Sequence, residues 1–197
     1  MYISNSDVEE RDEGDDLKED FETLYAEGIL SDVQLRTATQ TFNAHKNILS
    51  ARSPVFRAMF SNDMMEKVQE CVPVPDLEAD TVRRMLLYMY TKALKDLHWE
   101  SAMKLYAAAD KYEIVALKTK CSSFLICNLC PSNLCEVLVL ADMHADDNFK
   151  RVAQDYALLY EEEVFSSDEW NEFAKNNGPL AAETMLRKWN GKKTEGR

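Results

Sequence analysis

Two periodicities of hydrophobic and polar residues divide the chain. Apolar and polar residues alternate over Asp32–Arg36 and again over Thr41–Ala44, as they do in half-buried β-strands. From about Leu77 onward, apolar residues instead recur at spacings of three and four, the period of an amphipathic α-helix. Early strands followed by many helices predict an α+β fold with an all-helical C-terminal extension.

Short elements complete the pattern of the N-terminal half. Ser53 is a favourable N-cap, and Pro54 suits the first helical position. The helix that they begin places three apolar side chains on one face: Phe56, Met59 and Phe60. A second short helix is predicted over His45–Ser50. The proline-rich segment Cys71–Pro75 predicts an edge strand or an extended segment, because proline cannot donate to a central ladder.

The helical pattern after Leu77 resolves into five successive faces. We expect their buried residues at Val82, Met85, Leu86 and Met89; at Ala102, Leu105, Tyr106 and Ala109; at Leu117, Cys121, Phe124 and Leu125; at Leu134, Val137, Leu138 and Ala141; and at Phe149, Val152, Ala153 and Tyr156. Pro131 separates the third face from the fourth. Weaker helices are predicted around Trp170, and through Met185 after a break at Gly178–Pro179.

The N-terminus combines an acidic segment with an apolar stripe. Residues 1–16 are polar and acidic, which predicts a disordered arm. Leu17, Phe21 and Leu24 follow at i, i+4 and i+7 and form a narrow apolar stripe on a charged helix. Such a helix is not expected to be stable alone, so it should dock either on its own domain or on a second copy of the chain.

Charge and composition exclude several classes of partner. The 197 residues carry a formal net charge of -12, which argues against binding to nucleic acid or to an anionic membrane surface. No apolar run is long enough to span a bilayer. Five cysteines without a secretory signal favour a reducing compartment, either the nucleus or the cytoplasm.

No pattern in the chain predicts catalysis, a cofactor or a metal. Cys127 and Cys130 form a single Cys-x-x-Cys pair, whereas a structural zinc site needs four ligands. Cys121 lies on an apolar helical face, where a free cysteine behaves as a small hydrophobic residue. His45 has nearby serines but no third group to orient it as a general base, so we interpret it as structural.

Several ordered motifs resemble those of the BTB/POZ domain family, most of all its speckle-type POZ and TD-and-POZ subfamily. The motifs are Asp32-Val33-Gln34-Leu35, Phe42-Asn43-Ala44-His45-Lys46, Tyr88-Met89-Tyr90-Thr91, Ala107-Ala108-Ala109-Asp110-Lys111-Tyr112, Asn133-Leu134 and Leu138-Val139-Leu140-Ala141-Asp142-Met143-His144. The resemblance runs from about Leu17 to Trp189 and does not include the MATH domain that recruits substrates in longer members.

The resemblance implies a non-enzymatic, homodimeric adaptor that binds cullin-3 in a ubiquitin ligase and so serves ubiquitination. It implies a BTB/POZ domain over residues 17–127, a helical 3-box/BACK-like extension over residues 128–190 and a tail over residues 191–197. Leu17, Phe21 and Leu24 match the dimer interface. The residues that match the cullin contact are Met64, Met65, Glu66 and Tyr112, and the helices of residues 132–160 resemble the box that extends this contact.

Other interpretations stay open within the family. The chain could be an oligomerisation module or decoy that pairs with MATH-BTB relatives without recruiting substrate. A transcriptional repressor would need a DNA-binding segment. Lys92 replaces the glycine usual after the Tyr-Thr motif, so the helix end lacks a residue that easily adopts the left-handed conformation, and a different following loop is expected. Asp32 and Lys46 match a buried charged pair of some members, but they could equally be solvated.

Overall fold

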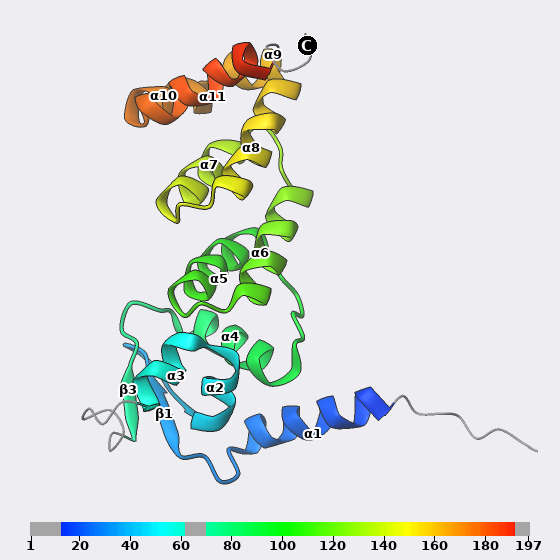
Figure 1. Cartoon of the computed structure of the whole chain (residues 1–197), viewed down its shortest axis with the longest axis vertical. Helices are drawn as coiled ribbons and strands as arrows, with labels where there is room; N and C mark the ends of the chain where they lie inside the picture. The colour runs from blue at the N-terminus through cyan, green and yellow to red at the C-terminus, as the bar shows by residue number, and fades with distance from the viewer. Residues whose placement is uncertain (1–12, 62–69, 192–197) are drawn as a thin grey trace, which may run out of the picture. The chain divides into compact units, whose positions relative to one another are not determined.

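The computed structural model describes residues 13–61 and 70–191 of the chain, and it is drawn in Figure 1. Its contacts separate the described residues into two compact units. We call the first the sheet unit; it comprises the residues up to Leu97 together with Lys111–Ile114. We call the second the helical unit; it comprises His98–Asp110 and the residues from Val115 onward.

A three-stranded sheet with the strand order β2-β1-β3 lies in the sheet unit. The strands are β1 (Val33–Arg36), β2 (Thr41–Ala44) and β3 (Cys71–Pro73). β1 and β2 are antiparallel with Leu35 opposite Phe42, and β1 and β3 are parallel with Leu35 opposite Val72. The alternating burial of β1 and β2 confirms the predicted pattern, and β3 is the predicted edge strand.

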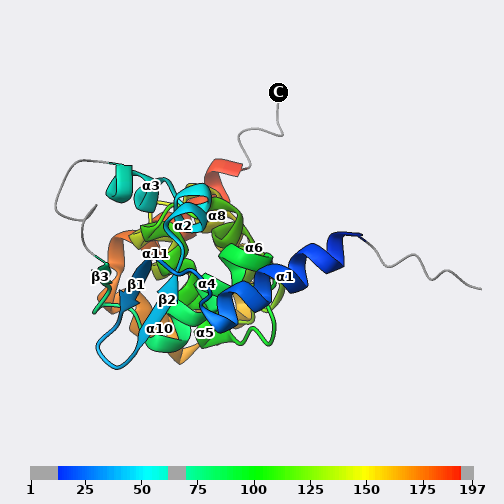
Figure 2. The ribbon, with the colours of Figure 1, turned by 90° about the horizontal axis from the view of Figure 1, so that it is seen from below.

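Four helices accompany this sheet. They are α1 (Glu13–Glu27), α2 (Lys46–Arg52), α3 (Pro54–Ser61) and α4 (Ala79–Thr91). α1 packs along α4, and α2 contacts both α3 and α4, as the view from below shows (Figure 2). The predicted inward face of α4, at Val82, Met85, Leu86 and Met89, is fully buried. Such a helix gains most of its stability from the packing of its apolar face against the rest of the unit.

Ser53 fixes the start of α3 as the sequence predicts. Its side-chain Oγ accepts a hydrogen bond from the backbone N–H of Phe56 at 3.1 Å. The same hydroxyl donates to the backbone carbonyl of Tyr112 at 2.5 Å, and Ser53 is completely buried. One side chain therefore caps α3 and ties it to the segment Lys111–Ile114 of the same unit.

The helical unit consists of helices alone within its described residues. They are α5 (Trp99–Lys111, of which the last residue belongs to the sheet unit), α6 (Val115–Cys127), α7 (Leu134–Met143), α8 (Asp147–Leu159), α9 (Glu161–Phe165), α10 (Asp168–Asn176) and α11 (Gly178–Gly191). The predicted faces of α5 and α7 are buried throughout. The sequence analysis missed α9, and α11 begins at Gly178–Pro179 because proline is tolerated in a first helical turn.

α4 ends on a left-handed residue although Lys92 stands in place of the usual glycine. Lys92 itself adopts the left-handed conformation with φ 57°, and its backbone N–H donates to the carbonyl of Tyr88 at 2.8 Å. α4 therefore ends in the cap that a glycine would form, although a lysine there has a Cβ that disfavours this backbone by about 1 kcal/mol. The α+β fold class, with a small sheet and an all-helical extension, is confirmed.

Candidate interaction surfaces

α1 presents part of its predicted apolar stripe to solvent. Leu17 is 59% exposed, whereas Phe21 and Leu24 are partly buried. Near the other end of the helix, the ring of Tyr25 packs against Tyr90 of α4 with 5.1 Å between the ring centroids. The helix thus docks on its own unit near its C-terminal end and leaves apolar side chains uncovered near its start.

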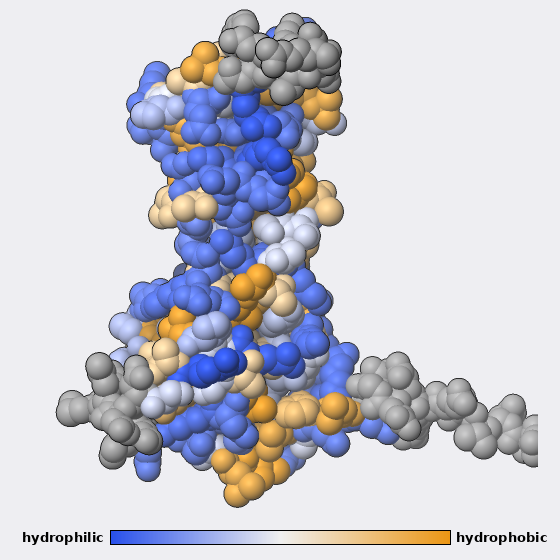
Figure 3. Space-filling view, viewed as in Figure 1, coloured by the Kyte–Doolittle hydropathy of each residue, from blue (hydrophilic) through white to orange (hydrophobic). Residues whose placement is uncertain are grey.

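The turn that joins α1 to β1 adds two exposed apolar side chains. Ile29 is 47% exposed and Leu30 is 88% exposed. Figure 3 shows apolar surface at the lower end of the sheet unit, where this turn lies in Figure 1, and along α1. We call Leu17, Ile29 and Leu30, with the partly buried Phe21 and Leu24, the seam surface.

The backbone of this turn is strained and held in place. Leu30 has a positive φ of 57°, a conformation that costs a non-glycine residue about 1–2 kcal/mol. The imidazole Nε2 of His45 donates to the carbonyl of Ile29 at 2.7 Å, because a carbonyl can only accept. The Nδ1 atom then accepts from the hydroxyl of Tyr90 at 2.6 Å. The buried His45 is therefore structural, and it anchors the turn that displays Leu30.

Burial also changes the acidity of the tyrosines behind the seam surface. Loss of hydration raises the pKa of Tyr90 to about 12, and burial raises the pKa of Tyr25 above its usual value. Both hydroxyls therefore stay neutral at physiological pH and can act as hydrogen-bond donors. An ion pair joins Glu22 of α1 to Lys95, with 3.3 Å between nitrogen and oxygen.

The predicted cullin contact divides between described and undescribed parts of the chain. Met64, Met65 and Glu66 lie outside the described residues. Tyr112 is only 3% exposed, because its ring stacks on Phe56 with 4.5 Å between the centroids. Phe56 stacks in turn on Phe60, near the end of α3. Tyr112 thus supports the helix that leads into Met64–Glu66, and its part in a partner contact stays a prediction.

Charged groups near Tyr112 are paired on the surface. Lys111 Nζ lies 2.8 Å and 2.7 Å from the two carboxylate oxygens of Asp76, and 5.2 Å from the centroid of the Tyr112 ring. The hydrogen bond from Lys111 holds the pKa of Asp76 below its usual range. Both charged side chains are about half exposed, so the pair orders the surface more than it stabilises the fold.

Asp32 and the backbone of Lys46 are joined near the start of α2. The carboxylate Oδ1 of Asp32 accepts the backbone N–H of Lys46 at 2.8 Å, and Asp32 is exposed. Asp32 thus satisfies one of the free N–H groups at a helix start. The Nζ of Lys46 lies 5.8 Å from the ring centroid of Phe60. The exposure of Asp32 favours the solvated alternative over a buried charged pair.

The cysteines are free thiols with no metal-binding arrangement among the described residues. Cys121 is buried on α6 as predicted, and loss of hydration raises the pKa of its thiol to about 12. Burial likewise raises the pKa of Cys135 to about 11. Both thiols stay protonated at neutral pH and are therefore poor nucleophiles. Within the described ranges, no helix is both long enough and apolar enough to cross a membrane.

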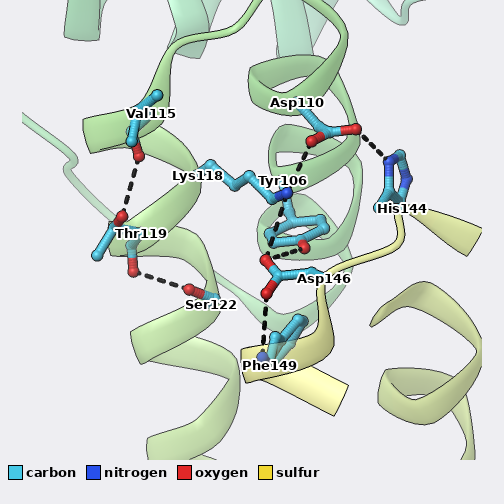
Figure 4. A network of polar contacts seen from close by, with 9 residues as sticks. All are labelled: Tyr106, Asp110, Val115, Lys118, Thr119, Ser122, His144, Asp146 and Phe149. Atoms are coloured by element: carbon cyan, nitrogen blue, oxygen red, sulfur yellow. Dashed lines mark hydrogen bonds and ion pairs between the residues drawn. The ribbon is translucent and has the colours of Figure 1, made fainter. Parts of the chain in front are cut away.

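A polar network in the helical unit joins α5 and α6 to the residues between α7 and α8 (Figure 4). The hydroxyl of the buried Tyr106 donates to Asp146 at 2.8 Å, and Lys118 Nζ lies 2.7 Å from Asp110 and 3.3 Å from Asp146. His144 Nδ1 lies 2.7 Å from the other oxygen of Asp110. Two carboxylates, one ammonium and one imidazole thus link α5 and α6 to the residues between α7 and α8.

Asp146 also caps α8, and the network lowers its pKa. Its Oδ1 atom accepts the backbone N–H of Phe149 at 3.0 Å. Burial tends to raise the pKa of Asp146, but the hydrogen bonds from Phe149, Tyr106 and Lys118 outweigh it and hold the pKa below its usual range. For Asp110, the hydrogen bonds from Lys118 and His144 likewise outweigh burial and lower the pKa.

An apolar groove lies between α5, α7 and α10 of the helical unit, with a volume of about 570 Å³. Its apolar lining comes from Met103, Val139, Leu140, Met143 and Phe173. The sulfur of Cys135 lies 3.9 Å from the backbone carbonyl of Glu169, which places α7 beside α10. We call this feature the α7–α10 groove.

Sequence patterns missed the turn residues of the seam surface and the whole groove. Ile29 and Leu30 form an apolar pair between a helix and a strand, and that pair was a usable signal. The groove offered no such signal, because its residues come from three helices whose pairing no periodicity reveals.

Comparison with known proteins identifies close sequence relatives. A family model described as the BTB/POZ domain matches residues 21–129. TD and POZ domain-containing protein 4 of Mus musculus is 36% identical over 170 residues, which are 86% of this chain and 46% of that protein. TD and POZ domain-containing proteins 3 and 1 of the same species are also 36% identical over 170 residues, 86% of this chain and 47% of each protein. The chain spans about half the length of the curated relatives it matches.

Proposed function

Because the chain belongs to the BTB/POZ domain family, we propose that it is a non-enzymatic homodimeric adaptor that binds cullin-3 in a ubiquitin ligase. Family membership supports the general role in protein interaction. The dimer, the cullin and the ligase are our proposal, together with a location in the nucleus or cytoplasm. The observation that carries the proposal is the seam surface, where large apolar side chains remain exposed on a rigid frame.

The seam surface supports a dimer because water-exposed leucines gain most from a second apolar surface. Full burial of one such side chain contributes about 1.5–3 kcal/mol to the free energy of association. In a twofold dimer every contact occurs twice. Leu30 has further support, since His45 holds its turn before any partner arrives. A surface ordered in advance loses less conformational entropy when it binds.

The aromatic stack supports the proposed cullin contact. Tyr112, Phe56 and Phe60 fix the end of α3, the helix that precedes Met64, Met65 and Glu66. Methionines offer adaptable apolar contact, and Glu66 would add a charge. A dimer with two such contacts would hold two cullins near one bound protein and so raise their effective concentration.

The cullin contact is tested by a double substitution in the full chain. Met64→Ala with Glu66→Lys should abolish binding of the cullin-3 N-terminal domain in isothermal titration calorimetry, while light scattering still reports the dimer mass. Glu162→Lys, the same charge reversal at an exposed position on α9, serves as a matched control. Unchanged affinity in the double variant would refute the assigned contact.

A second candidate function is a decoy that pairs with MATH-BTB relatives and lowers their recruitment of substrates. The same seam surface favours it, because pairing needs only the dimer contact. Mixing with a tagged MATH-BTB protein separates the two functions. Heterodimers without any cullin-3 binding would favour the decoy.

A further inference from the structure

The residues that line the α7–α10 groove differ from those of the seam surface and from Met64, Met65, Glu66 and Tyr112. Leu17, Phe21, Leu24 and Leu30 belong to the sheet unit, whereas every groove residue belongs to the helical unit. Its volume of about 570 Å³ exceeds those of two other cavities, of about 230 and 170 Å³, that lie beside α1. It falls within the usual range of ligand-binding clefts, about 300–1,000 Å³.

The groove's lining suits large apolar side chains. Val139 is partly buried, Met143 is 76% exposed, and Phe173 is buried with only 5% of it exposed. Methionines repack easily around different shapes, so the pair Met103 and Met143 can adapt to an incoming side chain. Phe173 adds a flat aromatic wall.

The groove's rim is acidic. Glu136 and Glu172 line it, and Glu169 lies on the same turn of α10 as Glu172. Glu136 accepts the indole N–H of Trp99 at 2.8 Å and is thereby oriented. Burial raises the pKa of the Cys135 thiol, and the negative charges of Glu169 and Glu136 raise it further. Three negative charges beside an apolar lining attract a cation that carries apolar groups.

The groove's end carries amides suited to a peptide backbone. Asn176 and Asn177 line it where α10 ends, and an asparagine side chain can both donate and accept hydrogen bonds. An extended peptide presents unpaired N–H and C=O groups along its length. An apolar lining, an acidic rim and terminal amides thus match an extended segment with apolar side chains next to Lys or Arg.

We propose that the α7–α10 groove binds such a basic, apolar segment of a client protein that the adaptor delivers to the ligase. This inference rests on the proposed function, because a client must bind at the same time as the cullin. Since α7 lies among the helices that resemble the extended cullin contact, cullin-3 is the competing occupant to be tested.

The binding test uses the full chain and a defined probe. The probe is a fluorescein-labelled peptide, Arg-Leu-Arg-Phe-Arg-Leu-Gly, followed by fluorescence anisotropy. Two matched peptides replace either its arginines with glutamate or its apolar residues with serine. The proposal expects saturable binding of the probe that weakens with added salt, and at least tenfold weaker binding of both matched peptides. Equal binding of the glutamate peptide would overturn the proposal.

Substitutions place the binding in the groove. Glu169→Lys with Glu172→Lys should weaken the probe about tenfold, whereas Glu162→Lys with Glu163→Lys, exposed on α9, should change it less than about twofold. Met143→Ser should also weaken binding, and Leu186→Ser on α11 is its exposed apolar control. These are surface changes, so folding should survive, and circular dichroism checks it. Equal losses in the controls would overturn the assignment.

Competition separates this inference from the proposed function. Saturating cullin-3 N-terminal domain should leave the probe bound. Displacement of the probe would assign the groove to cullin-3 and overturn the client site while supporting the adaptor. Probe binding without any cullin binding would retain the peptide site but refute delivery to a ligase.

Discussion

Leu30 should affect folding and dimerisation in opposite directions. The residue is 88% exposed in the single chain and has a φ of 57°. Leu30→Gly removes a left-handed strain of about 1–2 kcal/mol and adds a glycine entropy cost of about 0.5–1 kcal/mol. The free energy of unfolding of the isolated subunit should therefore rise by about 0.5–1 kcal/mol.

The same substitution should weaken the dimer. If both copies bury Leu30, its loss removes about 3–6 kcal/mol from the free energy of association, at about 1.5–3 kcal/mol per side chain. One factor of ten in the dissociation constant corresponds to about 1.4 kcal/mol, so the dimer should dissociate about 10²–10⁴ times more readily.

Two assays separate these effects. Urea unfolding is measured in the background Leu17→Asp with Phe21→Asp, which we expect to be monomeric, so that association does not contribute. Sedimentation equilibrium then compares Leu30→Gly with the unmodified chain. Glu113→Gly, which has a similar φ of 52° and an exposed side chain, controls for the backbone effect alone. A Leu30→Gly dimer as tight as the original would refute a role for Leu30 in the seam.

Three further predictions follow from the described contacts. Lys92→Gly should raise the free energy of unfolding, measured in urea, by about 0.5–1 kcal/mol, because glycine fits the left-handed end of α4. An unchanged midpoint of urea unfolding would count against backbone strain at Lys92. Ser53→Ala should lower the free energy of unfolding by about 2–3 kcal/mol, because the cap to Phe56 is lost and the buried carbonyl of Tyr112 loses its donor. A loss below about 0.5 kcal/mol would contradict this expectation. The pKa values of Asp110 and Asp146 are lowered in the folded chain. The stability that these two carboxylates contribute is therefore present above their unfolded pKa of about 4, and it is lost as the pH falls from there through the lower folded pKa. Asp146→Asn should flatten the decline of the free energy of unfolding between about pH 5 and pH 2, and an unaltered slope would refute that contribution.

Local patterns were sufficient for much of the fold. Alternation located β1 and β2, and Ser53 with Pro54 located the start of α3, because these signals depend on residues close in sequence. The buried faces of α4, α5 and α7 followed from helical spacing for the same reason. The conformation of Lys92 did not follow from its residue type, because its strain is small beside the packing of α4 and the surrounding structure could impose a left-handed residue.

The surfaces were harder to predict because exposure depends on tertiary contacts. Spacing placed Leu17, Phe21 and Leu24 on one face of α1, but packing against α4 determined which of them remain exposed. The exposure of Leu30 depends on His45, fifteen residues away in sequence, and on Tyr90 behind it. Motif resemblance placed Tyr112 near a partner surface. Its stacking on Phe56 is a tertiary contact between residues far apart in the sequence, so no local pattern predicts it.

A titration that follows the mass of the complex shows whether a dimer of the chain holds two cullins. Purified full chain is titrated with the cullin-3 N-terminal domain while light scattering coupled to size exclusion reports the mass of the complex. We expect saturation at micromolar concentration or below, with two chains and two cullin domains in one particle. An unchanged mass at micromolar cullin, or a complex of one chain with one cullin domain, would contradict it.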